Sequence, residues 1–168
     1  MGNEGLFGGE EYDMATISGP ISGDDKNTTV QALQGALTDL IDLSLVAKQS
    51  HWNVIGSHFR PIHLQLDELT DLAREHADTV AERIVALGAN PDGRAATTAK
   101  STKLAQLELG WIEDGKVVAT MTDTLDGISK RMRERIDATE EPDQVSQDIL
   151  IAVTQDIEKQ RWMFQAQR

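Results

Sequence analysis

Apolar residues recur at intervals of three and four along four long stretches of this 168-residue chain. This periodicity constrains the fold more than any other feature, because it places apolar side chains on one face of a helix. Alternating β-branched runs bounded by turns, which would indicate strands, are absent. The chain is therefore predicted to be all-α.

The four helices are expected at about residues 28–54, 61–87, 116–136 and 143–165. Pro61 opens the second helix, where its missing N–H costs nothing, and Gly88 with Pro91 ends it. A polar connector, 94–115, follows, with a short helix expected around Lys103–Leu109. Four long amphipathic helices with one long middle connection are typical of a four-helix bundle.

Residues 1–27 are predicted to be a flexible N-terminal tail, and residues 28–168 to form the bundle domain. The tail is rich in Gly, Glu, Asp and Ser and has no periodicity. It lacks the basic and apolar regions of a secretory signal. No apolar run in the chain approaches the ~18 residues that a membrane span needs. We therefore expect a cytoplasmic protein that makes no membrane contact.

The chain is acidic and contains no cysteine. Its 28 acidic and 16 basic residues give a formal net charge of −12. Such a surface repels phosphate backbones and attracts cations. Without cysteine, disulfides and thiolate metal sites are excluded, and a closed structural zinc site is not expected.

The second helix carries potential metal ligands on a face of their own. At roughly 100° per residue, His63, Asp67, Asp78 and Glu82 form a stripe turned away from the apolar residues of the same helix. A metal site inside a bundle would place its ligands among the core positions, usually with a Glu-x-x-His pair. That pair occurs nowhere in this chain.

The stripe consists of two pairs, each with the four-residue spacing that places side chains side by side. Asp67 and Asp78 are separated by about 16 Å along the helix, too far to share one ion. Two antiparallel copies, related by a two-fold axis near Leu72–Ala73, would set His63 and Asp67 of one copy against Asp78 and Glu82 of the other. An isologous dimer would then hold two equivalent sites.

His51, near the end of the first helix, could add a second imidazole to each site. Two imidazoles and three carboxylates suit Fe²⁺, with Zn²⁺ or Mn²⁺ as competitors. An acidic, partly open site stabilises Fe³⁺ over Fe²⁺ and so favours oxidation. The simpler interpretation is a solvated helix face, or a polar interface in a plain helical oligomer.

The stretch "HWNVIGSHFRPIH", followed by Asp67 and by "ADTVAER" at residues 77–83, resembles the ferroxidase motif of the Dps family, the ferritin-like mini-ferritins of starved bacteria. The resemblance covers the chain from about residue 28 to its end. It implies a ferritin-like subunit assembled into a hollow homododecamer. It also implies oxidation of iron, preferably by hydrogen peroxide rather than oxygen, at the dimer interface, with the mineral stored inside.

By motif position, the resemblance assigns His51, His63 and Asp67 to one subunit's share of the iron site and Asp78 and Glu82 to the other's. It also implies that Trp52 lies near the iron and takes up oxidising equivalents. An aromatic residue packed at an interface is the alternative. His58 and His76 have no matching partners and are not expected to be ligands, and Arg83 is expected to form an ion pair.

Two further expectations follow from the resemblance. Dps shells have a hydrophilic pore near the start of the third helix, where Asp123 and Asp126 share a helix face and could form negative rings that attract Fe²⁺. Dps proteins also bind DNA, usually through a lysine-rich tail. Residues 1–27 here hold one basic residue, Lys26, against six acids, so DNA binding by the tail is not expected.

The sequence leaves a second function open. In that alternative the protein compacts the nucleoid as a DNA-binding structural protein, and its iron chemistry is secondary.

Overall fold

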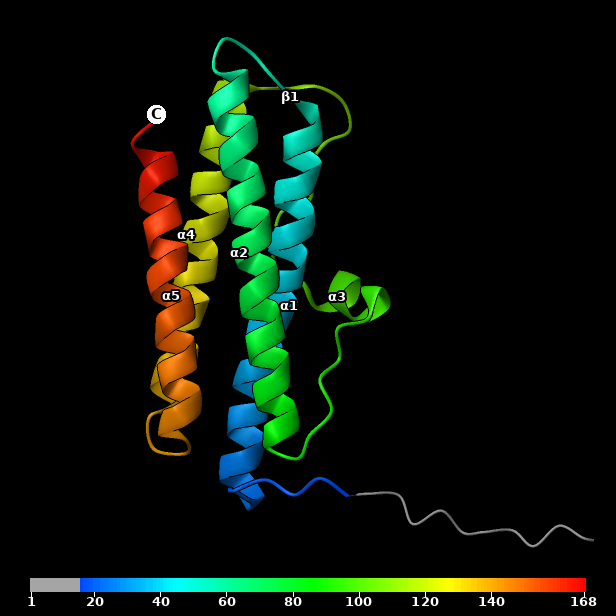
Figure 1. Cartoon of the computed structure of the whole chain (residues 1–168), viewed down its shortest axis with the longest axis vertical. Helices are drawn as coiled ribbons and strands as arrows, with labels where there is room; N and C mark the ends of the chain where they lie inside the picture. The colour runs from blue at the N-terminus through cyan, green and yellow to red at the C-terminus, as the bar shows by residue number, and fades with distance from the viewer. Residues whose placement is uncertain (1–15) are drawn as a thin grey trace, which may run out of the picture.

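The computed structural model describes residues 16–168 (Figure 1). Four long helices run side by side: α1 (Gly23–Asn53), α2 (Phe59–Ala86), α4 (Asp114–Thr139) and α5 (Gln144–Gln165). Helices α1 and α5 run in one direction and α2 and α4 in the other, so the connection between α2 and α4 must return along the bundle (Figure 1). This confirms the predicted four-helix bundle.

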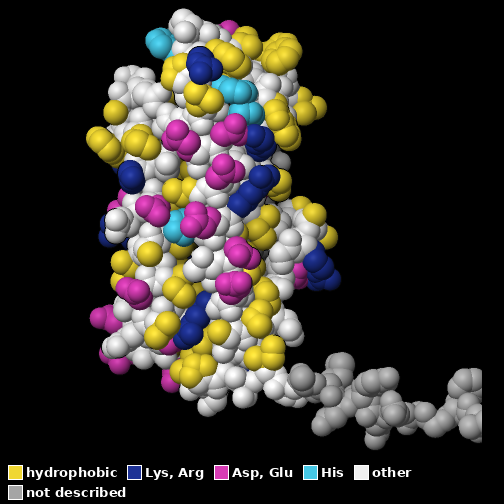
Figure 2. All heavy atoms as spheres, viewed as in Figure 1, with side chains coloured by type: hydrophobic (Ala, Val, Ile, Leu, Met, Phe, Trp, Pro, Cys, Tyr) yellow, Lys and Arg dark blue, Asp and Glu magenta, His cyan; other side chains and the backbone are white. Residues whose placement is uncertain are grey.

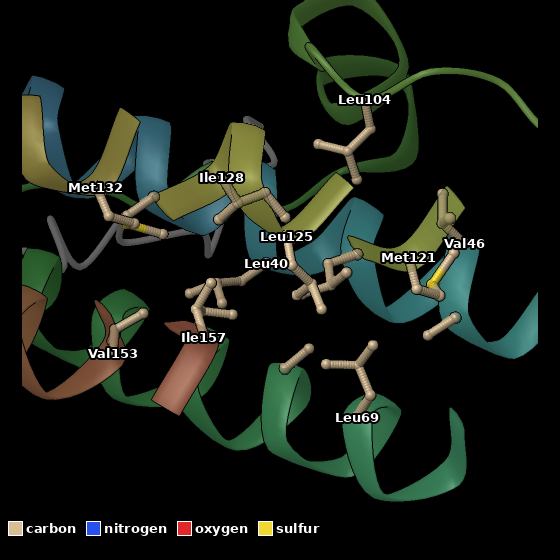
Figure 3. Packing of buried hydrophobic residues seen from close by; sticks show 14 of the residues in the cluster. Leu40, Val46, Leu69, Leu104, Met121, Leu125, Ile128, Met132, Val153 and Ile157 are labelled. Atoms are coloured by element: carbon tan, nitrogen blue, oxygen red, sulfur yellow. The ribbon is translucent and has the colours of Figure 1, made fainter. Parts of the chain in front are cut away.

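The bundle core is built by all four long helices. Leu40, Leu69, Leu125 and Ile157, one from each helix, are fully buried and belong to one continuous apolar cluster (Figure 3). Burying a side chain of this size contributes roughly 1.5–3 kcal/mol relative to leaving it exposed. None of the helices within residues 16–168 is long and apolar enough to cross a membrane.

The first helix starts five residues earlier than expected. It begins at Gly23, after Ser22 in extended conformation, with Asp24 and Asp25 in the first turn. Their negative charges are favourable at a helix N-terminus. This turn has no apolar residue, so periodicity alone could not reveal it. The last part of the predicted tail is therefore helical, while residues 1–15 lie outside the described part of the chain.

The second helix ends where Gly88 was expected to end it. Gly88 has a φ of 71°, and the N–H groups of Gly88 and Ala89 donate to the carbonyls of Val85 and Ile84. This is the hydrogen-bond pattern of a Schellman motif, which favours glycine at that position. At the other end, α2 begins at Phe59, so Pro61 still lies in the first turn.

A short helix is present in the middle connection, but its predicted position was wrong. Helix α3 spans Ala95–Ser101, and residues 103–109 are not helical. Asp92 accepts hydrogen bonds from the Arg94 N–H and the Thr97 hydroxyl at the start of α3. Residues 103–109 instead form an irregular segment in which Leu104 is buried and Leu109 is exposed.

A two-residue parallel pair joins β1 (Val54–Ile55) to β2 (Ile112–Glu113), with Val54 opposite Ile112. No strand was expected, because two residues are too few to show an alternating pattern. The pair ties the end of α1 to the start of α4, at the end of the bundle where the histidine motif lies.

Candidate functional site

Two histidines hold each other in place where α1 runs into α2. His51 Nδ1 lies 2.8 Å from the backbone oxygen of His63, and His63 Nδ1 lies 2.9 Å from the backbone oxygen of His51. Their rings stack with centroids 3.6 Å apart. A carbonyl oxygen can only accept, so each Nδ1 donates, and the Nε2 lone pair of each neutral ring remains available to a metal ion.

Asp67 lies beside this pair, one helical turn beyond His63 on α2. Its Oδ1 is 3.3 Å from His51 Nδ1 and accepts a hydrogen bond from Lys48. The hydrogen bond from Lys48, together with the charges of the nearby basic groups, lowers the pKa of Asp67 below its ordinary 3.8. Asp67 is therefore an ionised ligand candidate at neutral pH.

Lys48 is the residue near the site that sequence reasoning missed. It precedes His51 by three positions on α1, so it occupies the same helix face one turn away. That spacing was the available signal. In the isolated chain the Lys48 ammonium already holds the Asp67 carboxylate that a metal ion would use.

Asp78 and Glu82 lie farther along α2 and are both exposed. Neither makes a hydrogen bond or an ion pair with another residue of 16–168. Asp78 lines a surface pocket of about 310 Å³ with Arg74 on α2 and Leu37 and Ile41 on α1. Figure 2 shows acidic side chains spread over this face of the molecule, with histidine near its upper end and also among them.

The structure thus brings three of the five predicted ligands together and leaves two apart. His51, His63 and Asp67 are in contact, whereas Asp78 lies about 16 Å along the helix from Asp67. Within residues 16–168, no three His, Asp or Glu side chains form a set that could hold a metal ion. A single chain therefore presents part of a site at each position.

Trp52 follows His51 directly and is the last residue but one of α1. Its side chain is 63% exposed, whereas His51 is 7% exposed. A tryptophan this exposed beside a buried histidine is available to a partner surface as well as to redox chemistry. The single chain favours neither role.

The two aspartates predicted to line a pore are both ion-paired within the chain. Asp123 accepts from Arg168, and Asp126 accepts from Arg161 and pairs with Lys130. The hydrogen bond from Lys130 lowers the pKa of Asp126. Both groups are charged, but neighbouring cations offset much of that charge. Their place at a pore remains a prediction.

The remaining histidines and Arg83 have partners elsewhere. His76 Nε2 lies 2.9 Å from Asp156 on α5, and the His58 backbone N–H donates to Asp114. Arg83 forms the expected ion pair, with Asp143 at 2.7 Å, and so joins α2 to the N-cap of α5.

The chain is similar to known proteins over most of its length. A family model described as a ferritin-like domain matches residues 30–168. DNA protection during starvation protein 2 of Deinococcus radiodurans is 34% identical over 92% of this chain, which spans 64% of that protein. The DNA protection during starvation protein of Mycolicibacterium smegmatis is 33% identical, over 91% of this chain and 84% of that protein.

A solved structure shows the same likeness in three dimensions. The Dps of Microbacterium arborescens, in a form described as high in iron, matches with a TM-score of 0.83 and 33% identity. The match covers 87% of this chain and 95% of that one.

The four-helix fold and the family match over residues 30–168 define a ferritin-like protein. Within that class the chain belongs to the Dps family, the DNA protection during starvation proteins, as the motif in residues 51–83 predicted.

Proposed function

We propose that this protein oxidises Fe²⁺ at sites shared between two copies of the chain and stores the Fe³⁺ mineral inside a shell of twelve copies. One observation carries the proposal. At one end of the outward face of α2, His63 and Asp67 cluster with His51 of α1, and at the other end the exposed acids Asp78 and Glu82 have no side-chain partner within residues 16–168.

A second copy supplies what each end lacks. With the two α2 helices antiparallel about Leu72–Ala73, the cluster of one copy meets the acids of the other, and the dimer contains two equivalent sites. The centres of the two half-sites are fifteen residues apart on α2, so the two iron sites of a dimer are expected about 22 Å apart.

The residues of the site have distinct tasks in this proposal. His51 and His63 offer Nε2 lone pairs whose direction is fixed by the reciprocal Nδ1 hydrogen bonds. Asp67, Asp78 and Glu82 supply negative charge, which favours the ferric over the ferrous state. Trp52 is placed to take up oxidising equivalents, and hydrogen peroxide is the proposed preferred oxidant.

The relatives support this function. The Microbacterium arborescens Dps, which shares the fold and a third of the sequence, was solved in a high-iron form. Oxidation at the dimer interface would remove Fe²⁺ and peroxide together, which protects a cell under oxidative stress. We propose a cytoplasmic location for this iron store.

The test is Fe²⁺ oxidation by the assembled protein, followed by absorbance with hydrogen peroxide and, separately, with oxygen. Iron bound without oxidant is expected to saturate at two ions per dimer, with faster oxidation by peroxide. Oxidation no faster than in protein-free buffer would reject the ferroxidase proposal. A faster reaction with oxygen would keep the ferroxidase but reverse the oxidant preference.

A DNA-binding structural role is the second candidate, favoured by the names of the relatives, which describe DNA protection. It is tested by a gel shift with duplex DNA in ~0.15 M salt after divalent cations are removed. Because the tail segment 1–27 is acidic, we expect no retardation by the tail at sub-micromolar protein.

A further inference from the structure

A second pocket, of about 290 Å³, opens between α1, α4 and the segment that includes α3. It shares no residue with the iron-binding face of α2. Three cationic side chains line it: Lys103 from the connection and Arg131 and Arg135 from α4. Lys103 and Arg131 also line an adjoining pocket of about 200 Å³. Cations converge here on a chain whose net charge is −12.

A buried carboxylate fixes both arginines. Asp39, on α1, is 2% exposed and accepts hydrogen bonds from Arg131 Nε and Nη2, at 3.0 and 2.9 Å, and from Arg135 Nη1 at 2.7 Å. A guanidinium has five N–H donors, so each arginine keeps further donors beyond those used on Asp39. The two guanidinium groups are therefore held in place before any ligand arrives.

Gly35 makes room for this arrangement. A Cβ at residue 35 would lie 2.9 Å from Arg135 Nη2 and 3.0 Å from its Nε. Glycine inside a helix costs roughly 0.5–1 kcal/mol relative to alanine. A side chain at residue 35 would require the Arg135 guanidinium to shift away from α1.

The charges in this pocket do not cancel. Asp39 offsets one of the three cations, and Lys103 makes no ion pair with any residue of 16–168. The next acid along α1, Asp42, is buried and accepts from the Thr102 hydroxyl. Counting Asp42 as well, the pocket keeps a surplus of positive charge.

The other acids nearby have their own cations: Asp92 pairs with Arg94, and Asp123 pairs with Arg168. More distant acids are largely screened, because the Debye length is about 8 Å at physiological salt. The local cations therefore decide which ions the pocket attracts.

We propose that this pocket binds a phosphate group. Guanidinium forks and an ammonium group match the several acceptor oxygens of phosphate, which can receive more donors than a carboxylate can. The Ser101 hydroxyl, which also lines the pocket and has no hydrogen-bond partner within residues 16–168, adds a neutral donor. The chemistry suits inorganic phosphate and the phosphodiester of a nucleic acid.

The test measures inorganic phosphate binding to the full-length protein, freed of iron, by ³¹P NMR line broadening. Lys103 is exposed and outside the Asp39 network, so Lys103→Glu leaves the fold intact. Reversing this charge is expected to weaken phosphate binding at least about tenfold. The matched control is Lys100→Glu, an exposed lysine on α3 that does not line the pocket, with a change below about twofold.

Absence of saturable phosphate binding, or equal weakening by Lys103→Glu and Lys100→Glu, would overturn the proposal. A second arm separates the two sources of phosphate. If a short DNA duplex displaces inorganic phosphate from the parent protein, and if the Lys103→Glu variant no longer binds that duplex, the ligand is a nucleic acid phosphodiester. Phosphate binding without displacement by the duplex supports inorganic phosphate. Fe²⁺ oxidation in phosphate-free buffer, measured on the same variants, reports separately on the iron site.

Discussion

The two ends of the α2 face differ in how much of their structure one chain can build. At one end, His51 and His63 exchange hydrogen bonds with each other's backbone, and Asp67 is ionised beside Lys48. At the other end, Asp78 and Glu82 are exposed and have no partner within residues 16–168. One proposed half-site is organised within residues 16–168, and the other is proposed to gain its partners from a second copy.

This difference shows how ligand geometry can be divided between two surfaces. An imidazole must direct its lone pair at the metal ion, and a hydrogen bond from its other ring nitrogen fixes that orientation. Carboxylates can bind a metal through either oxygen and need less preparation. In the proposed site, the histidines belong to the half that one chain holds rigid, and two of the carboxylates come from the other copy. Such a site can form although only one of its halves is rigid.

The largest expected effect is at the organised end. Replacing His63 by alanine removes one imidazole and the hydrogen bond that it donates to the backbone oxygen of His51, while the backbone oxygen of residue 63 that accepts from His51 Nδ1 remains. We expect Fe²⁺ oxidation to slow about 100-fold, since loss of supporting groups alone costs 10–100-fold in metal sites. The oligomer, measured by size exclusion, should persist. His58→Ala is the matched control, and dissociation of the His63 variant would instead make the cluster a structural element.

The next effect concerns Arg83, which follows Glu82 in the sequence. Arg83 forms an ion pair with Asp143 of the same chain. Asp143→Ala removes this ion pair and the N-cap of α5, and should cost about 2 kcal/mol, roughly 30-fold in the unfolding equilibrium. Iron oxidation should change little. Glu141→Ala, which removes an exposed acid from the same turn, should leave the unfolding temperature nearly unchanged.

The same pair gives stability a pH dependence. Burial raises the pKa of Asp143, but hydrogen bonds from Arg83 and Ser146 outweigh it, and the net pKa is lowered below 3.8. A lowered folded-state pKa stabilises the fold above pH 3.8, and the contribution is lost as pH falls through the folded value. The Asp143→Ala variant should lack this part of the acid transition. An unchanged transition would contradict the assignment.

A smaller effect is expected from Lys48, the cation at the organised end. Lys48→Gln removes an ammonium that competes with metal for Asp67. Charges 4 Å apart in water-like surroundings interact by about 1 kcal/mol, so Fe²⁺ should bind about fivefold more tightly. Anaerobic Fe²⁺ titration measures this, with Lys116→Gln as control. Weaker binding would mean that Lys48 supports the ligand geometry rather than opposing the ion.

The smallest effect is expected at the predicted pore. Because Arg168, Arg161 and Lys130 already offset Asp123 and Asp126, changing both aspartates to asparagine should slow iron uptake by no more than about twofold at low Fe²⁺ and low salt. Glu134→Gln with Asp137→Asn on the same helix is the control. A slowing of fivefold or more would show that these carboxylates act as a ring of unbalanced charge in the shell.

Sequence patterns predicted the parts of this structure that repeat along a helix. The apolar period located α2, α4 and α5 to within two or three residues. It missed the first turn of α1, whose residues are polar. The short helix of the middle connection was misplaced, because α3 lies at Ala95–Ser101 and residues 103–109 form an irregular segment that buries Leu104.

Contacts between elements distant in the chain were beyond these patterns. The pairing of Asp126 with Arg161 on α5, and that of Asp39 with Arg131 and Arg135, joins residues from different helices. No local period encodes such pairs. Lys48 is different, because the sequence shows its three-residue spacing from His51. The sequence does not show that its partner is Asp67.

The central claim, that each iron site is shared between two copies, is tested most directly by mixing two inactive variants. His63→Ala damages one half-site and Asp78→Ala damages the other, and each variant alone should oxidise Fe²⁺ slowly. When the two are co-expressed, half of the dimers are mixed and each mixed dimer has one intact site, so about a quarter of the parent activity should return. If each site lies within one chain, the mixed protein contains no intact site and stays as inactive as either variant alone.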